Sequence, residues 1–192
     1  MEEKNILVIS DLHDSHSGLE KLKKWTKSEK VDLVLGAGDL TSTPNPYQIE
    51  TFKKIISILG EKIPFFTIAG NNEKEETINW LRKKGILLEK KNFFGFKFLG
   101  ISGWGEDTQI LSKESLDDKT ILISHVPPIV FPRGRIKIED FKNCPKIHLF
   151  GHLHQEFFEK IIGNTRAIHI PPLLFGNALI LTIPSFKIKI LE

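Results

Sequence analysis

The sequence is poor in cysteine and contains no long apolar run. Cys144 is the single cysteine among 192 residues, which excludes an internal disulfide and indicates a reducing compartment. No apolar run approaches the length of about 20 residues that a membrane-spanning helix needs. Charged residues at the start are followed at once by a strand-like run, so we expect no signal peptide. Together these features predict a cytoplasmic protein without a membrane partner.

An excess of charge of one sign is also lacking. The 27 lysine and arginine residues nearly cancel the 24 aspartate and glutamate residues, which leaves a formal charge of +3. We therefore do not expect a nucleic-acid partner, which would favour a basic patch or tail. Glutamine occurs only at positions 48, 109 and 155, whereas Lys, Glu and Ile are abundant. This balance is typical of proteins from thermophiles.

The order of apolar segments indicates the fold class. Apolar runs at residues 5–10, 31–35 and 63–68 alternate with segments whose apolar residues recur at helical spacing, which predicts a parallel sheet covered by helices. The second half is poorer in helix, and its turn signals suggest hairpins. Its predicted strands are residues 93–102, 120–124, 146–150, 156–162, 166–170, 178–183 and 186–191. We predict one α/β domain over residues 1–192, with two packed mixed β-sheets flanked by helices.

Five of the apolar runs end in the same kind of polar chemistry. Ligands of open α/β sheets bind outside the carboxyl ends of the strands, so these side chains are expected to converge on one edge. Each of them alone is more simply a turn, a cap or an ordinary polar residue, but five such strand ends are hard to explain by capping. The residues are Asp11 and His13, Asp39, Asn71, His125, and His152 and His154.

The types of ligand in this set indicate metal binding. Two carboxylates, one amide oxygen and four imidazoles, without a thiolate, suit Mn, Fe, Zn, Co or Ni. Seven ligands are too many for one tetrahedral ion and suit two ions that share a carboxylate. Such ions, about 3.5–4 Å apart, can hold a bridging hydroxide and position a phosphoryl group for in-line displacement. We expect two divalent or trivalent ions, with manganese as the first choice.

The ordered motifs resemble the calcineurin-like metallophosphoesterase family, in particular its compact archaeal and bacterial members. They are D-L-H at 11–13, G-D at 38–39, G-N at 70–71, H-V-P-P from 125 and G-H-L-H at 151–154. The resemblance implies a four-layer αββα sandwich. It also implies that Asp11, His13 and His154 bind one metal, that Asn71, His125 and His152 bind the other, and that Asp39 bridges the two.

The stretch Gly70-Asn71-Asn72-Glu73 departs from the family pattern, which usually has a histidine after G-N. In many relatives that histidine is thought to orient the phosphate or protonate the leaving oxygen, so the resemblance makes Asn72 a catalytic candidate. An amide can donate a hydrogen bond but cannot deliver a proton. A simpler role for Asn72 is to cap a helix, because Glu75 follows three residues later as in a capping box. His16 is a candidate for the missing acid, or a solvent-facing residue near a helix start.

The function most consistent with these residues is hydrolysis of a phosphate ester. We expect a dinuclear metal-dependent phosphodiesterase that acts on a small or activated substrate, with a metal-bridging hydroxide as nucleophile. One alternative is a non-catalytic metal-binding scaffold, because the family includes a retromer subunit that also departs at this histidine. Another is a metal-dependent nuclease, against which the near-neutral charge argues. A homodimer is compatible with the sequence.

Overall fold

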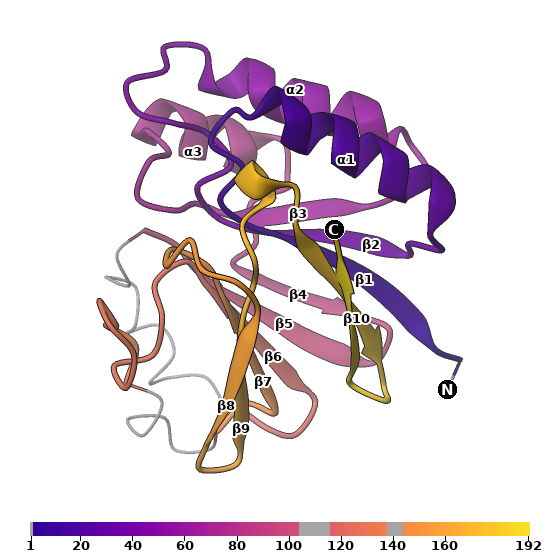
Figure 1. Cartoon of the computed structure of the whole chain (residues 1–192), viewed down its shortest axis with the longest axis vertical. Helices are drawn as coiled ribbons and strands as arrows, with labels where there is room; N and C mark the ends of the chain where they lie inside the picture. The colour runs from indigo at the N-terminus through magenta and orange to yellow at the C-terminus, as the bar shows by residue number, and fades with distance from the viewer. Residues whose placement is uncertain (1, 104–115, 138–143) are drawn as a thin grey trace.

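The computed structural model describes residues 2–103, 116–137 and 144–192. Two β-sheets pack face to face, and the N- and C-terminal parts of the chain meet in one of them (Figure 1). This five-stranded sheet has the order β11-β10-β1-β2-β3. Its parallel strands are β1 (Lys4–Ile9), β2 (Leu33–Ala37) and β3 (Phe65–Ile68). The antiparallel strands β10 (Ala178–Ile183) and β11 (Lys187–Leu191) complete it.

The six-stranded sheet has the order β4-β5-β6-β7-β9-β8. Its four central strands are parallel, and an antiparallel strand forms each edge. The strands are β4 (Lys90–Phe93), β5 (Phe96–Ile101), β6 (Thr120–Ser124), β7 (Ile147–Phe150), β8 (Phe158–Ile162) and β9 (Thr165–His169). The carboxyl ends of the parallel strands are where the predicted ligands follow, so this arrangement can bring them together.

The core consists of two apolar layers because alternate residues of each strand point to opposite faces. Ile6 and Val8 of β1 face the second sheet, where they share one buried cluster with Ile121 and Leu149. Leu7 instead belongs to the cluster beneath the helices. Those helices are α1 (His16–Ser28), α2 (Gln48–Leu59) and α3 (Glu75–Lys83), and they cover the outer face of the five-stranded sheet (Figure 1).

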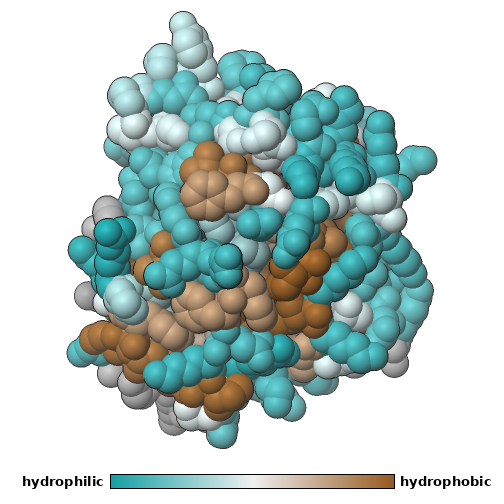
Figure 2. Space-filling model, viewed as in Figure 1, coloured by the Kyte–Doolittle hydropathy of each residue, from teal (hydrophilic) through white to brown (hydrophobic). Residues whose placement is uncertain are grey.

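The outer face of the six-stranded sheet is covered differently. Leu122 packs there with Val126 and Ile136 in a third buried cluster, and the Phe131 ring lies 5.2 Å from the Phe150 ring. Within the described ranges no α-helix covers this face. Figure 2 shows a mostly hydrophilic surface over the helical layer and more apolar side chains over the half that holds this sheet. None of the described helices is long and apolar enough to cross a membrane.

The predicted α/β sandwich of two mixed sheets is confirmed, with local corrections. The strand predicted over residues 93–102 is wrong at its start, because β4 ends at Phe93 and β5 begins at Phe96. Phe94 and Gly95 have φ angles of 53° and 78°, as a two-residue hairpin turn requires. Phenylalanine rarely adopts such a conformation, so an apolar run gave no signal of this turn. The second predicted strand also begins two residues later, at Leu33.

Candidate metal centre

The loops that follow five parallel strands bring all seven predicted ligands to one edge of the sandwich. Backbone hydrogen bonds join neighbouring loops within each of the two sheets. Asp11 N–H donates to the Gly38 carbonyl at 3.1 Å, and His13 N–H donates to the Asp39 carbonyl at 3.1 Å. In the other sheet, Gly151 N–H donates to the His125 carbonyl at 3.1 Å. The backbone therefore fixes the turns that carry the predicted ligands to their neighbours within each sheet, and the His152 N–H links the two sheets by donating to Asp11 Oδ2 at 3.1 Å.

One group of ligands gathers around Asp11. His154 Nε2 lies 3.1 Å from Asp11 Oδ1 and 3.0 Å from His13 Nε2. His13 Nε2 lies 3.9 Å from the same carboxylate oxygen. The ligand atoms of these three residues all lie within 4.8 Å of one another, so one ion can contact all three.

A second group gathers around His125. Its Nε2 lies 3.2 Å from Asp39 Oδ2, 3.0 Å from Asn71 Oδ1 and 3.2 Å from His152 Nδ1. The His125 Nδ1–H donates to the Ala37 carbonyl at 3.0 Å, which leaves Nε2 for a ligand. Asp39 Oδ2 is also 3.9 Å from His13 Nε2. Asp39 therefore lies between the two groups, where a shared carboxylate would have to be.

The backbone around these side chains is strained. Asp11, His13, Asp39, His152 and His154 have φ angles of 50°, 48°, 50°, 72° and 51°. Residues with a Cβ rarely adopt such angles, and strain of this kind persists where the surrounding structure enforces it, often at functional sites. Five of the seven predicted ligands thus occupy unfavourable backbone conformations.

Two glycines allow the ligand turns to approach closely. A Cβ at Gly70 would collide with the Asp39 carboxylate, and a Cβ at Gly151 would collide with Ser10 Oγ. Both glycines directly precede a predicted ligand, Asn71 or His152. The G-N and G-H pairs in the sequence therefore have a steric reason as well as a chemical one.

The charges of the site suit a cation. Burial disfavours ionisation of Asp11, but the hydrogen bond with His154 and the charge of His125 outweigh it, so the Asp11 pKa is lowered. Asp39 is similar: burial is outweighed by His125 and by the Asn72 N–H, and its pKa is lowered. Burial likewise opposes a charge on His125, yet the two carboxylates raise its pKa to about 9. Two ionised, buried carboxylates facing four imidazoles fit the donor set of a metal centre.

Comparison with known proteins identifies the family. Residues 4–156 match the family model of the calcineurin-like phosphoesterases. The chain belongs to this family. The resemblance found in the motifs is thereby confirmed, and the protein is a hydrolase that acts on phosphate esters. Calcineurin-like phosphoesterases depend on two metal ions. Two groups of side chains could each hold an ion here: one is Asp11, His13 and His154, and the other is Asp11, Asp39 and His125.

Individual relatives are distant in sequence but similar in fold. The UPF0046 protein K07C11.7 of Caenorhabditis elegans is 24% identical over 213 residues, which cover 90% of this chain and 71% of that protein. The crystal structure of TT1561 of Thermus thermophilus has a TM-score of 0.72 at 14% identity and covers 100% of this chain and 99% of that one. A novel archaeal phosphodiesterase has a TM-score of 0.63 at 17% identity, with coverage of 97% and 98%.

Asn72 contacts Asp39, the predicted bridging carboxylate of this calcineurin-like phosphoesterase. Its backbone N–H donates to Asp39 Oδ1 at 2.8 Å, and its side-chain Nδ2 donates to Asp39 Oδ2 at 2.5 Å. The predicted helix cap is wrong, because α3 begins at Glu75 after Lys74 and no side chain caps it. The Asn72 amide bonds a charged acceptor instead, which is the stronger hydrogen bond.

Glu73 connects two of the ligand turns from beneath. Its buried carboxylate accepts the N–H groups of Asp39 at 3.0 Å, Thr41 at 3.0 Å and Gly70 at 2.6 Å. Burial and the Asp39 charge raise the Glu73 pKa. The Glu73 carboxylate thus lies between the turns that follow β2 and β3.

Within the described residues, no hydrogen bond or ion pair joins His16 to the seven predicted ligands. His16 is the first residue of α1, is exposed, and lines a groove of the helical layer together with Lys23 and Lys54. Asp14, near it in sequence, has another structural role. Its carboxylate accepts from Ser42 N–H at 2.9 Å and from Thr51 Oγ1 at 2.6 Å.

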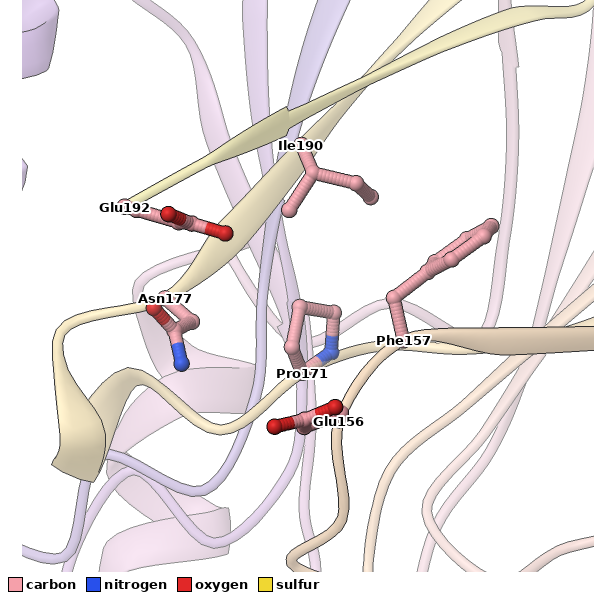
Figure 3. Close-up of a pocket in the computed structure, with 6 residues that line it drawn as sticks. All are labelled: Glu156, Phe157, Pro171, Asn177, Ile190 and Glu192. Atoms are coloured by element: carbon pink, nitrogen blue, oxygen red, sulfur yellow. The ribbon is translucent and has the colours of Figure 1, made fainter.

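The segment after β9 supports Asp11 in a way that the sequence did not indicate. Leu173 N–H donates to the Ser10 carbonyl at 2.8 Å, and Leu174 N–H donates to the Asp11 carbonyl at 2.9 Å. These bonds are made by the backbone, so no residue type in the sequence indicates them. Beside this segment lies a pocket of about 450 Å³ that contains none of the seven ligands (Figure 3). It is lined by Glu156, Phe157, Pro171, Asn177, Ile190 and Glu192.

Proposed function

We propose that this phosphoesterase hydrolyses phosphodiesters at a two-metal centre formed by the seven residues. The observation that carries the proposal is the position of Asp39, whose Oδ2 lies 3.9 Å from His13 Nε2 and 3.2 Å from His125 Nε2. Asp11, His13 and His154 would hold one ion, Asn71, His125 and His152 the other, and Asp39 both. When bound, the ions supply an activated water and offset the charge that develops on the phosphoryl group.

The chain's own residues then determine which esters react well. Asn72 occupies the place of the family histidine and has no proton to give to a leaving oxygen. General-acid assistance typically contributes about 10²–10⁴-fold, so its absence matters most for esters of weakly acidic alcohols. We therefore infer that the protein acts on activated esters, whose leaving groups depart without protonation. One Nδ2 hydrogen of Asn72 bonds Asp39, and the other remains to orient a phosphate oxygen.

Backbone strain also supports catalysis over a purely structural role for the fold. The five ligands with positive φ each cost of order 1–3 kcal/mol in stability. A scaffold that binds no substrate has no need of such a costly arrangement. The nuclease alternative has no comparable support, since the formal charge is only +3.

A metal-by-substrate matrix tests the proposal. Metal-stripped protein is reloaded with Mn, Fe, Zn, Co or Ni and assayed on bis(p-nitrophenyl) phosphate, p-nitrophenyl phosphate and cyclic nucleotides. We expect metal-dependent hydrolysis, highest with manganese and on the activated diester. Inactivity with every metal, at a confirmed content of two ions per chain, would refute the proposal.

The bridging role of Asp39 has its own test. Asp39→Ala should lose both ions, because both groups depend on the shared carboxylate. Asp118→Ala, at an exposed aspartate outside the centre, is the matched control and should keep them. A metal content of two per chain in Asp39→Ala would show that Asp39 is not the bridge.

A further inference from the structure

The loop of residues 127–136 lies directly beside the His125 group. It closes on itself through Arg135 N–H, which donates to the Pro127 carbonyl at 3.0 Å, and Ile129 N–H, which donates to the Ile136 carbonyl at 2.9 Å. The Phe131 ring fixes it to the sheet, 5.2 Å from the ring of Phe150. The loop thus begins next to His125 and packs on the strand that leads to His152, so it borders the metal centre on this side.

Arg133 is held at the turn of this loop. Its φ is 58°, and the following Gly134 N–H donates to the Phe131 carbonyl at 3.0 Å. A Cβ at Gly134 would collide with the Pro128 carbonyl, so the turn is tightly packed. The tight turn fixes the backbone from which the Arg133 side chain extends.

The Arg133 side chain extends from the turn that Phe131 packs against Phe150, and among the described residues it has no partner. Burial and the charge of His125 lower the His152 pKa, and the Arg133 charge adds to this effect. Arg133 is exposed, and in residues 2–103, 116–137 and 144–192 no group forms a hydrogen bond or ion pair with it. An arginine beside a phosphoesterase centre is suited to an anion, because its planar fork matches phosphate and carboxylate oxygens.

We propose that Arg133 binds a second anionic group of the substrate, on the part that extends past His152, and so selects diesters that carry an additional phosphate or carboxylate. The inference rests on the proposed function. Arg133 lies outside the seven ligands and at the exposed rim, which favours a contact beyond the reacting phosphorus. Ile129 and Val130 of the same loop are 48% and 44% exposed, and they offer an apolar surface for the intervening part of the substrate.

Binding of two nucleotides to the manganese-loaded protein tests this assignment. Thymidine 3′,5′-bisphosphate and thymidine 5′-phosphate differ only by the second phosphate, and their Kd values can be measured by calorimetry. We expect the native protein to prefer the bisphosphate. Arg133→Gln should weaken bisphosphate binding by about tenfold, as loss of one exposed charge-assisted contact does, and leave the monophosphate unchanged. The bisphosphate Kd of Arg133→Lys should lie between those of the native protein and Arg133→Gln. Lys137→Gln changes an exposed residue next to the loop and serves as the control, so its Kd values should match those of the native protein.

Several results would overturn the assignment. A native protein that binds both nucleotides equally, or neither, has no second anion site. Equal weakening of both by Arg133→Gln would mean that Arg133 contacts the phosphate at the metals or acts through its long-range field. Because the readout is binding, it is independent of turnover. Failure of the metal-by-substrate matrix would therefore refute the proposed function without deciding the role of Arg133.

Discussion

His148 should make the stability of this protein sensitive to acid. It is fully buried in β7, on the outer face of the six-stranded sheet. Its Nε2 lies 2.7 Å from Ser124 Oγ, which donates to the Val126 carbonyl at 2.6 Å. Burial lowers the His148 pKa to about 3, so the folded protein holds this imidazole in its neutral form.

The magnitude follows from the difference between the folded and unfolded states. The unfolded chain has a histidine pKa of about 6.5, so the unfolded state takes up the proton first as the pH falls. The contribution of His148 to the free energy of unfolding is therefore full above pH 6.5. This contribution is lost progressively as the pH falls from 6.5 to about 3. At pH 5 the loss is about 2 kcal/mol, from roughly 1.4 kcal/mol per pH unit below 6.5.

The assay is urea unfolding of metal-stripped protein from pH 7.5 to pH 5. His148→Gln keeps a donor for Ser124 but cannot titrate. Between these two pH values its free energy of unfolding should therefore fall by about 2 kcal/mol less than that of the native protein. The matched control is His16→Gln, which removes an exposed histidine. It should alter the pH dependence of the free energy of unfolding less than His148→Gln does. Parallel curves for His148→Gln and the native protein would refute the reasoning.

Three further predictions concern the centre and its supports. Asn72→His should stay folded and gain kcat on esters with poor leaving groups but not on nitrophenyl esters, because it supplies a titratable imidazole. Equal gains on both kinds of ester would indicate that the imidazole binds phosphate instead of donating a proton. Gly151→Ala should reduce the metal content measured by elemental analysis, because the added Cβ displaces Ser10 and Asp11. Gly60→Ala is the control: its backbone is also strained, at φ 65°, but the space around it is open, so it should lose stability without losing metal. Glu73→Gln should lower the free energy of unfolding by about 1–3 kcal/mol for each N–H left without an acceptor. A loss below about 0.5 kcal/mol in denaturant unfolding would contradict the role of the Glu73 carboxylate in joining the two turns.

The two sheets, and the convergence of the seven candidate ligands, could be predicted from the sequence because both leave local patterns. Apolar runs mark buried strands, and polar residues at their ends mark a common edge. Interactions between distant residues leave no such pattern. Asn72 bonds Asp39, which lies 33 positions away, so capping seemed the simpler role for it. Arg133, which we propose as an anion contact, was not indicated because a lone arginine in a loop has no sequence signature. His16 became a candidate only through its nearness in sequence to the first motif.

The predicted ligands of each ion come from both β-sheets. The Asp11 group takes Asp11 and His13 from the turn after β1, and His154 from the turn after β7. The His125 group likewise combines Asp39 and Asn71 of one sheet with histidines of the other. Each ion would therefore act as a cross-link between two halves that otherwise meet through an apolar interface. Because a ligand bound only by the folded state stabilises it by about 2.7 kcal/mol at 100 times its Kd, metal supply would govern the lifetime of the folded protein as well as its activity.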